Sequence, residues 1–203
     1  MKPEKRSLAL LLSLFLFLGV VTWYVVYNDS LRESEKMQKN NIFQSENPAF
    51  DFSFEYPATG WSLDESQGRT EKYDAVYLKG PVDEEKQFRF LIEVVVKPLQ
   101  KGGAPADLLQ AFLGRVSPWP KFKLVSKKEA TIGGEKAFSA IYESEERLPI
   151  ESLNGKPTMI KEQTIFLTRK DRSYRFSFHA LADQWDASSP AFKQVLKTFK
   201  FKE

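Results

Sequence analysis

One uncharged stretch near the amino terminus limits what the whole chain can be. Residues Leu8–Tyr27 read LALLLSLFLFLGVVTWYVVY, twenty residues without a charged side chain. As an α-helix, at about 1.5 Å per residue, this stretch would be about 30 Å long, which matches the hydrocarbon thickness of a bilayer. Trp23 and Tyr24 stand near its end, where aromatic side chains favour the membrane interface. We therefore expect a transmembrane helix that contacts the lipid bilayer through Leu8–Tyr27.

A cleaved signal peptide is the alternative interpretation of this stretch. Its apolar core would be only about 7–15 residues long and a small-x-small cleavage site would follow. No such site follows Tyr27, so an uncleaved signal anchor is favoured. Lys5 and Arg6 precede the helix directly, whereas Asn28 and Asp29 follow it. Because positive charge stays inside, we expect a cytoplasmic tail at residues 1–7 and the remaining chain on the extracytoplasmic side, whether periplasmic, extracellular or lumenal.

The chain changes character after the apolar stretch. Residues 28–48 are mostly polar and predict a solvated stalk, with a coiled-coil dimerisation stalk as the alternative. Residues 49–203 have the usual length of one domain. The sequence contains 17 Phe and no cysteine, so this domain would be stabilised by an aromatic core and not by disulfides.

Alternating residues indicate strands in this domain. In the segment FDFSFEY, from Phe50 to Tyr56, large aromatic and polar residues alternate, which is typical of a strand with one buried face. Residues 88–97 carry apolar side chains on both faces and predict a strand covered on both sides. Two hairpins are expected further on, one turning at Gly133-Gly134 and one joining residues 159–168 to residues 173–180.

Two helices are expected beside these strands. After Gly102-Gly103-Ala104-Pro105, the apolar residues from Leu108 to Val116 recur at helical spacing. Near the end of the chain, Ser189 predicts a helix N-cap with Pro190 in the first turn, and residues 200–202 predict an edge strand. Sequential hairpins with two helices indicate an α+β fold, an antiparallel β-sheet flanked by helices behind one amino-terminal transmembrane helix.

Several segments of the domain resemble the PsbP-like family, which is named after an extrinsic subunit of photosystem II. The opening FDFSFEYPATGW is similar to the aromatic strand, Tyr-Pro and Trp with which that family begins. The segments IGGEKAFSAIYE, SYRFSFHALA and PAFKQVLKTFKF are similar to its central hairpin, late hairpin strand and terminal helix. DcrB-type bacterial envelope proteins look similar too. The resemblance implies a PsbP-like sandwich that serves as a non-catalytic docking or assembly module.

No residue pattern in the chain predicts catalysis or a cofactor. His179 is the single histidine, and alternation places it opposite Phe176 and Phe178, without the further ligands that a zinc site needs. The acidic runs at 83–85 and 143–146 lack the spacing of a calcium loop. A net charge of +3 without a basic cluster does not fit a nucleic-acid-binding protein. We therefore predict no catalytic, cofactor-binding or metal-binding residues, and no enzyme.

The segment WPKFK, after the first predicted helix, has the composition of a protein interface. Trp119 is a large aromatic residue, Lys121 and Lys123 are cationic, and Pro118 and Pro120 stiffen the backbone. Because Trp is enriched at binding interfaces, these residues are the predicted partner-binding site. The alternative is that Trp119 only covers the core.

These patterns together favour a membrane-anchored, extracytoplasmic, non-catalytic binding or assembly module. Its expected partner is a membrane or envelope protein. A domain that binds or senses a small ligand or metal ion is the alternative, and an unrecognised hydrolase is a further one. A deep polar pocket would favour the ligand-binding alternative, and a nucleophile beside a perturbed His or carboxylate would favour the hydrolase.

Overall fold

The computed structural model describes residues 40–65, 73–83, 88–99, 103–148 and 155–202. The predicted cytoplasmic tail, the predicted span Leu8–Tyr27 and most of the predicted stalk lie outside these residues. Within the described ranges, no helix combines the length and the apolar character needed to cross a membrane. The segment from Asn40 to the carboxyl terminus is one compact unit.

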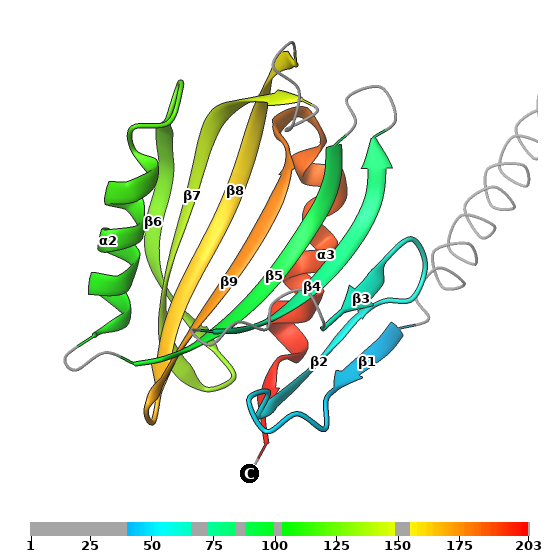
Figure 1. Ribbon diagram of the computed structural model, residues 1–203, viewed down its shortest axis with the longest axis vertical. Helices are drawn as coiled ribbons and strands as arrows, with labels where there is room; N and C mark the ends of the chain where they lie inside the picture. Colours follow the sequence, from blue (N-terminus) through cyan, green and yellow to red (C-terminus); the bar gives the residue numbers. More distant parts are fainter. Residues whose placement is uncertain (1–39, 66–72, 84–87, 100–102, 149–154, 203) are drawn as a thin grey trace, which may run out of the picture. The chain divides into compact units, whose positions relative to one another are not determined.

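The described residues form two antiparallel β-sheets, which we call the large sheet and the small sheet (Figure 1). The strand order in the large sheet is β3-β4-β5-β9-β8-β7-β6. Its strands are β3 (Ser62–Asp64), β4 (Asp74–Asp83), β5 (Phe88–Pro98), β6 (Lys123–Ile132), β7 (Glu135–Leu148), β8 (Lys156–Arg169) and β9 (Arg172–Leu181). Each of the hairpins predicted from the sequence is present, and β9 is the central strand, paired with β5 on one side and with β8 on the other.

The small sheet consists of β1 (Asn40–Gln44), β2 (Phe52–Pro57) and β10 (Lys200–Phe201), in the order β1-β2-β10. Its presence differs from the single sheet expected from the sequence. It also places Asn40–Gln44 in the folded domain, where the sequence suggested that the stalk would run to Pro48. Phe43 attaches this segment to the core, because its buried ring stacks on Phe54 at a centroid distance of 4.8 Å.

Two helices cover opposite faces of the large sheet. Helix α2 (Pro105–Val116) packs on β7 and β8, and it begins as expected with Pro105 in its first turn. Helix α3 (Trp185–Thr198) packs on β9 and on β2 of the small sheet. Figure 1 shows α2 and α3 on either side of the strands.

The start of α3 corrects the sequence prediction. The helix follows a short 3-10 turn (Ala182–Gln184) and begins at Trp185, so Ser189 is a buried residue inside the helix and not its N-cap. Pro190 lies within the helix, where it removes one backbone hydrogen bond. The ring of Trp185 packs against Phe178, with centroids 5.1 Å apart. This tertiary contact fixes the helix start and offsets the local preference of Ser and Pro for a helix terminus.

The main core lies between the large sheet, α3 and the small sheet. It is strongly aromatic, and its fully buried rings include Phe52, Phe54, Tyr174, Phe176, Phe178 and Phe192. A second, smaller cluster lies under α2, on the other face of the large sheet. The alternation of residues along β5 and β9 therefore separates an aromatic face from the face on which α2 lies.

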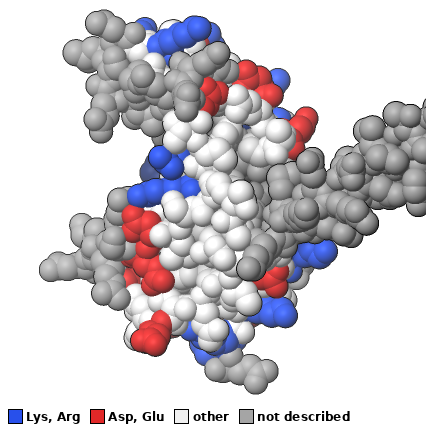
Figure 2. Space-filling model, turned by 90° about the vertical axis from the view of Figure 1, so that its right-hand side faces the viewer, with Lys and Arg blue, Asp and Glu red and all other residues white. Residues whose placement is uncertain are grey.

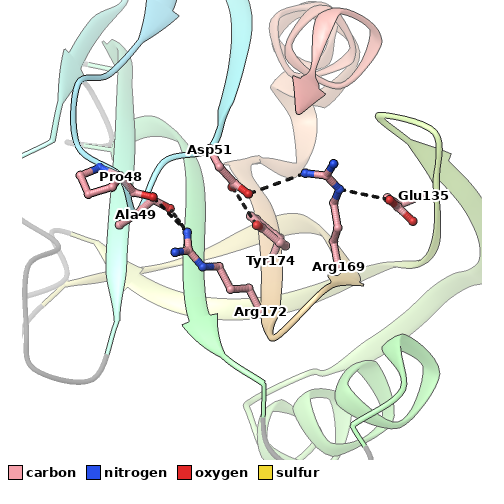
Figure 3. A network of polar contacts seen from close by, with 7 residues as sticks. All are labelled: Pro48, Ala49, Asp51, Glu135, Arg169, Arg172 and Tyr174. Carbon is pink, nitrogen blue, oxygen red and sulfur yellow. Dashed lines mark hydrogen bonds and ion pairs between the residues drawn. The ribbon is translucent and has the colours of Figure 1, made fainter. Parts of the chain in front are cut away.

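A polar network connects the small sheet to the β8–β9 turn of the large sheet (Figure 3). The Tyr174 hydroxyl donates a hydrogen bond to Asp51 Oδ1 at 2.8 Å, and Arg169 forms ion pairs with Asp51 at 3.7 Å and with Glu135 at 3.3 Å. The Arg172 guanidinium donates a hydrogen bond to the backbone carbonyl of Ala49 at 2.9 Å. These bonds join the beginning of the domain to a turn more than a hundred residues later, and they hold the small sheet against the large sheet.

Candidate protein-binding surface

The predicted partner-binding segment forms a compact loop between α2 and β6. The Trp119 N–H donates to Val116 O at 2.9 Å, and the Phe122 N–H donates to Trp119 O at 3.1 Å. The loop is also attached to the sheet, because the Glu145 N–H donates to Pro120 O at 2.8 Å. With these backbone bonds and two prolines, the loop would lose little conformational entropy when it binds a partner.

Trp119 is at once part of a packed cluster and part of the surface. One edge of its indole ring approaches Tyr142, with a centroid distance of 6.4 Å, and Phe122 packs on the same Tyr142 ring at 5.5 Å. The Trp119 residue nevertheless remains 40% exposed. Trp119 therefore packs on the domain with one part of its side chain and leaves another part exposed.

Leu124 and Val125 extend the apolar surface beyond Trp119. They are 44% and 43% exposed, respectively. Among the described residues, five large hydrophobic side chains are exposed, and three of them are Trp119, Leu124 and Val125. We call these three residues the Trp119 patch. Strand alternation could not predict that Leu124 and Val125 are exposed. Their strand β6 lies at the edge of the large sheet, and a β-bulge between Leu124 and Ser126 displaces Val125 from the regular pairing.

Three lysines, Lys121, Lys123 and Lys127, stand close to the Trp119 patch in the chain, and we call them its lysine rim. Lys121 adopts the left-handed backbone conformation, with φ of 52°, and forms an ion pair with Glu145. Lys123 is exposed and is paired in register with Glu143 on β7. Further along β6, Lys127 donates a hydrogen bond to Gln110 of α2 at 2.8 Å. The structure thus places the predicted residues Trp119, Lys121 and Lys123 in one region, with Lys121 already paired to a carboxylate.

His179 has a partner that the sequence analysis missed. Its Nδ1 lies 2.9 Å from Glu162 Oε2 on β8, and the Glu162 side chain is only 5% exposed. Burial alone would lower the pKa of His179, but the attraction and hydrogen bond of Glu162 outweigh it and raise the pKa above its ordinary value of 6.5. Burial would raise the pKa of Glu162, yet His179 holds it below its ordinary value. Each partner therefore favours the charged form of the other.

The signal for this pair was present in the hairpin. Lys170 and Asp171 form a two-residue turn, in which Lys170 has a φ of 53°. Once that turn is located, the register of β8 and β9 places Glu162 opposite His179. The sequence predicted a hairpin between residues 159–168 and residues 173–180 without locating its turn, so the register, and the partner with it, stayed undefined.

The groups around His179 do not form a hydrolase triad. Ser177 lies on the same face of β9 as His179, but its buried hydroxyl is hydrogen-bonded to the Thr164 hydroxyl at 2.8 Å. Tyr142, on β7, is buried near Glu162, and burial together with this negative charge raises the pKa of its hydroxyl. Among the described residues, no group of three His, Asp or Glu side chains is placed to hold a metal ion. The arrangement is that of a partly buried ion pair within a β-sheet face.

A second apolar region lies on the side of the domain that carries β3, β4 and α3. Figure 2 shows uncharged surface in the middle of this side, with charged groups at its borders. A groove of about 410 Å³ there is lined by Pro57, Trp61, Pro81, Phe90, Gln184, Ala187, Ser188 and Ala191. Trp61 is seated against Gly80, where an added Cβ would lie only 2.9 Å from the indole ring. Gly80 therefore allows Trp61 to form the wall of this groove.

Solved structures identify the fold. The sequence matches no protein-family model and no curated protein. The chain is similar in structure to the cyanobacterial PsbP protein CyanoP of Synechocystis sp. PCC 6803, at 15% identity and a TM-score of 0.52, over 80% of this chain and 92% of that one. The domain has the PsbP-like fold. The resemblance seen in its strands and terminal helix is thereby confirmed as a resemblance of structure.

Other proteins share this PsbP-like fold. LpqN, which is involved in cell envelope biogenesis of Mycobacterium tuberculosis, is 17% identical, with a TM-score of 0.54, over 84% of this chain and 96% of its own length. A variant of the protein Mog1 is 11% identical, with a TM-score of 0.50, over 82% of this chain and 97% of its own length. At such identities the likeness describes the fold, and function has to be argued from the residues of this chain.

Proposed function

We propose that the protein is a membrane-anchored, extracytoplasmic binding or assembly module that docks a partner protein through the Trp119 patch and its lysine rim. One observation carries the proposal: three of the five large hydrophobic side chains exposed among the described residues lie within this short segment. An aromatic and two aliphatic side chains inside a polar rim are the usual anatomy of a binding site whose centre is desolvated in the complex.

The surroundings of the patch define the chemistry of the partner. Lys123 and Lys128 are exposed cations on β6, so a partner segment with an apolar side chain and nearby carboxylates would be complementary to them. Strand addition to β6 is disfavoured, because a bulge and several lysines are the features by which natural proteins protect an exposed sheet edge. Docking would therefore involve side chains on the surface rather than backbone pairing.

The anchor and the fold support the same proposal. Attachment through Leu8–Tyr27 would confine the domain to a layer beside the bilayer and raise its effective concentration toward a membrane or envelope protein. LpqN, which shares the fold, takes part in cell envelope biogenesis. Protease added outside intact spheroplasts or right-side-out vesicles should digest the domain, and protection until lysis would reverse the proposed topology.

Photo-crosslinking in intact cells tests the docking surface. A photoreactive residue at Val125 should crosslink the full-length protein to a partner, whereas the same residue at Val82, which is similarly exposed on β4, should not. Affinity is then measured with the purified partner. Trp119→Ala should weaken binding by about 1–3 kcal/mol, the usual loss for an aromatic anchor. Lys123→Glu should weaken it as well, and a compensating basic substitution in the partner should restore it.

Thermal unfolding of the same variants separates docking from packing. Trp119→Ala removes one contact to Tyr142, so a moderate loss of stability is expected beside the loss of affinity. Loss of stability with unchanged affinity would show that Trp119 serves the core alone. Equal crosslinking from Val125 and Val82 would remove the Trp119 patch as the docking site.

A further inference from the structure

A cavity of about 490 Å³ lies beside α2, between that helix and the central strands β5 and β9. Its walls are Val95, Lys97, Pro98, Leu108, Ala111, Arg115, Phe166, Ser173 and Arg175. The volume is within the range of about 300–1,000 Å³ that is typical of small-molecule sites. The cavity is distinct from the Trp119 patch, so it requires an explanation that the proposed function does not supply.

Three of these walls are cations. Lys97 comes from β5, Arg175 from β9 and Arg115 from the last turn of α2, and none of the described residues lining the cavity is acidic. Arg175 forms an ion pair with Glu93 on the neighbouring strand, yet its Nε is buried and has no hydrogen-bond partner among the described groups. The charge of the cavity is therefore compensated only in part by the protein itself.

The positions of the two arginines are fixed by an aromatic ring. The guanidinium carbon of Arg115 lies 5.9 Å from the centroid of Phe112, and that of Arg175 lies 5.7 Å from the same centroid. Burial lowers the pKa of Lys97, and the nearby charges of Arg175 and Arg115 lower it further. The two arginines thus repel the positive charge of Lys97, and an anion between the three cations would relieve that repulsion.

Apart from Ser173, the remaining residues that line the cavity are apolar. Leu108 and Ala111 face it from α2, Val95 faces it from β5, and Phe166 faces it from β8. An inorganic anion would be bound by the cations but would leave these walls without a partner. A neutral apolar molecule would fill the walls but leave the cations uncompensated. The two halves of the cavity together fit a molecule that has both a charged end and an apolar body.

We propose that this cavity binds a small amphipathic anion, a phosphate or carboxylate group carried on an apolar body. The anionic group is held by Lys97, Arg115 and the guanidinium of Arg175, and the apolar body lies along Leu108, Ala111 and Phe166. This ligand chemistry is shared by soluble organophosphates and by the headgroup of an anionic lipid. The site goes beyond the proposed docking function and does not depend on it.

Calorimetric titration of the full-length protein in a non-ionic detergent tests the site. Phenyl phosphate is the probe, with inorganic phosphate and phenol as its charged and apolar halves. Phenyl phosphate should bind at least about tenfold more tightly than either half, because only it satisfies both sets of walls. Arg115→Gln and Lys97→Gln should each weaken phenyl phosphate at least about fivefold, since each removes one charge-assisted contact. Lys193→Gln, an exposed cation on α3, is the matched control and should leave the affinity unchanged.

Three further measurements sharpen the result. Thermal unfolding should show that Arg115→Gln and Lys97→Gln remain folded, so that a loss of affinity reports the site. Affinity in the wild type should fall as pH rises through the lowered pKa of Lys97, and Lys97→Gln should lose this dependence. Vesicles of phosphatidylcholine with phosphatidic acid should displace phenyl phosphate if the natural source is a lipid headgroup, and should not if it is a soluble metabolite.

The proposal would be overturned by any of three results. The first is equal affinity for phenyl phosphate in the wild type, Arg115→Gln and Lys97→Gln. The second is equal affinity of the wild type for phenyl phosphate and phenol, and the third is no binding of phenyl phosphate at millimolar concentration. Because neither substituted residue belongs to the Trp119 patch, failure here leaves the docking proposal standing, and failure of the docking proposal leaves this one standing.

Discussion

The two faces of the large sheet are built from alternate residues of the same strands, yet they differ in composition and in cover. On the face toward α3 and the small sheet, β9 presents Tyr174, Phe176 and Phe178, all completely buried. On the other face, the same strand presents Arg175, Ser177 and His179. Helix α2 packs there mainly on β7 and β8, and the charged residues of β5 and β9 lie beside it.

In one strand, the buried aromatic rings therefore lie on one side and the charged and hydroxyl groups lie on the other. The aromatic face buries large rings against two other layers, which supplies most of the hydrophobic stabilisation. The face under α2 carries the cationic cavity, and Arg175, Ser177 and His179 each have a polar partner there. We therefore expect substitutions on the first face to change stability most, and substitutions on the second to change pH dependence and binding.

The largest expected difference is between one phenylalanine on each face. Phe178→Ala should lower the free energy of unfolding by about 3–5 kcal/mol, because Phe178 is completely buried against Trp185 and Phe192. Phe166→Ala, under α2, should cost clearly less, since Phe166 borders a cavity and packs in the smaller cluster. Urea unfolding measures both. An equal or larger cost for Phe166→Ala would contradict the assignment of stability to the aromatic face.

The His179–Glu162 pair should give the second face a pH signature. Because the pKa of His179 is raised in the folded protein, protonated His179 stabilises the fold below about pH 6.5. This stabilisation is lost as pH rises through the folded pKa. Because the pKa of Glu162 is lowered in the folded protein, ionised Glu162 stabilises the fold above about pH 4.5. This stabilisation is lost as pH falls through the folded pKa. Glu162→Gln should therefore lower stability most between these values, by about 1–3 kcal/mol, and less at higher pH.

Thermal unfolding across pH measures this signature. Glu129→Gln is a suitable control, because the ion pair of Glu129 with Lys136 lies on the same sheet but both side chains are 65% exposed. An exposed pair of this kind contributes about 0–1 kcal/mol, so its removal should leave the pH profile unchanged. If Glu162→Gln leaves the profile unchanged too, the pair does not stabilise the folded protein. His179→Gln should alter the profile in the same window without changing partner capture.

The smallest expected effect concerns the hydroxyl pair of Thr164 and Ser177. Thr164→Val should destabilise the protein by about 1 kcal/mol, because it leaves the buried Ser177 hydroxyl without its partner. Adding Ser177→Ala removes that unpaired group and should restore most of the loss. Urea unfolding of the two single variants and the double variant forms a complete cycle. Additive losses in the double variant would show that the two hydroxyls do not stabilise each other.

Much of the fold could be predicted from local patterns. The strand near Phe52, the hairpin at Gly133-Gly134 and the helix after Pro105 were all expected and are present. These elements can be predicted because they depend on residues that are neighbours in sequence. The alternation or helical spacing of those residues indicates which face of the strand or helix is buried. The small sheet was not expected, because β1, β2 and β10 come together only after segments from both ends of the domain have met.

The candidate sites divide in the same way. Trp119, Lys121 and Lys123 were chosen as a candidate partner-binding segment because aromatic, basic and proline residues adjoin one another in the sequence. Leu124 and Val125 could not, because their exposure follows from the position of β6 at the edge of the sheet and from its bulge. Glu162 was missed as the partner of His179, since only the register of the β8–β9 hairpin brings the two side chains together.

The sequence by itself determined the period of each strand, the turns between hairpin strands and the apolar segment expected to span a membrane, because each depends on residues within one stretch of chain. Tertiary structure alone decided where α3 begins, which charges became partners and that Lys97, Arg115 and Arg175 line one cavity. The physical reason is that burial and electrostatic attraction act through space. Their strength depends on distances between atoms, and these distances are set only when strands and helices far apart in the chain have packed together.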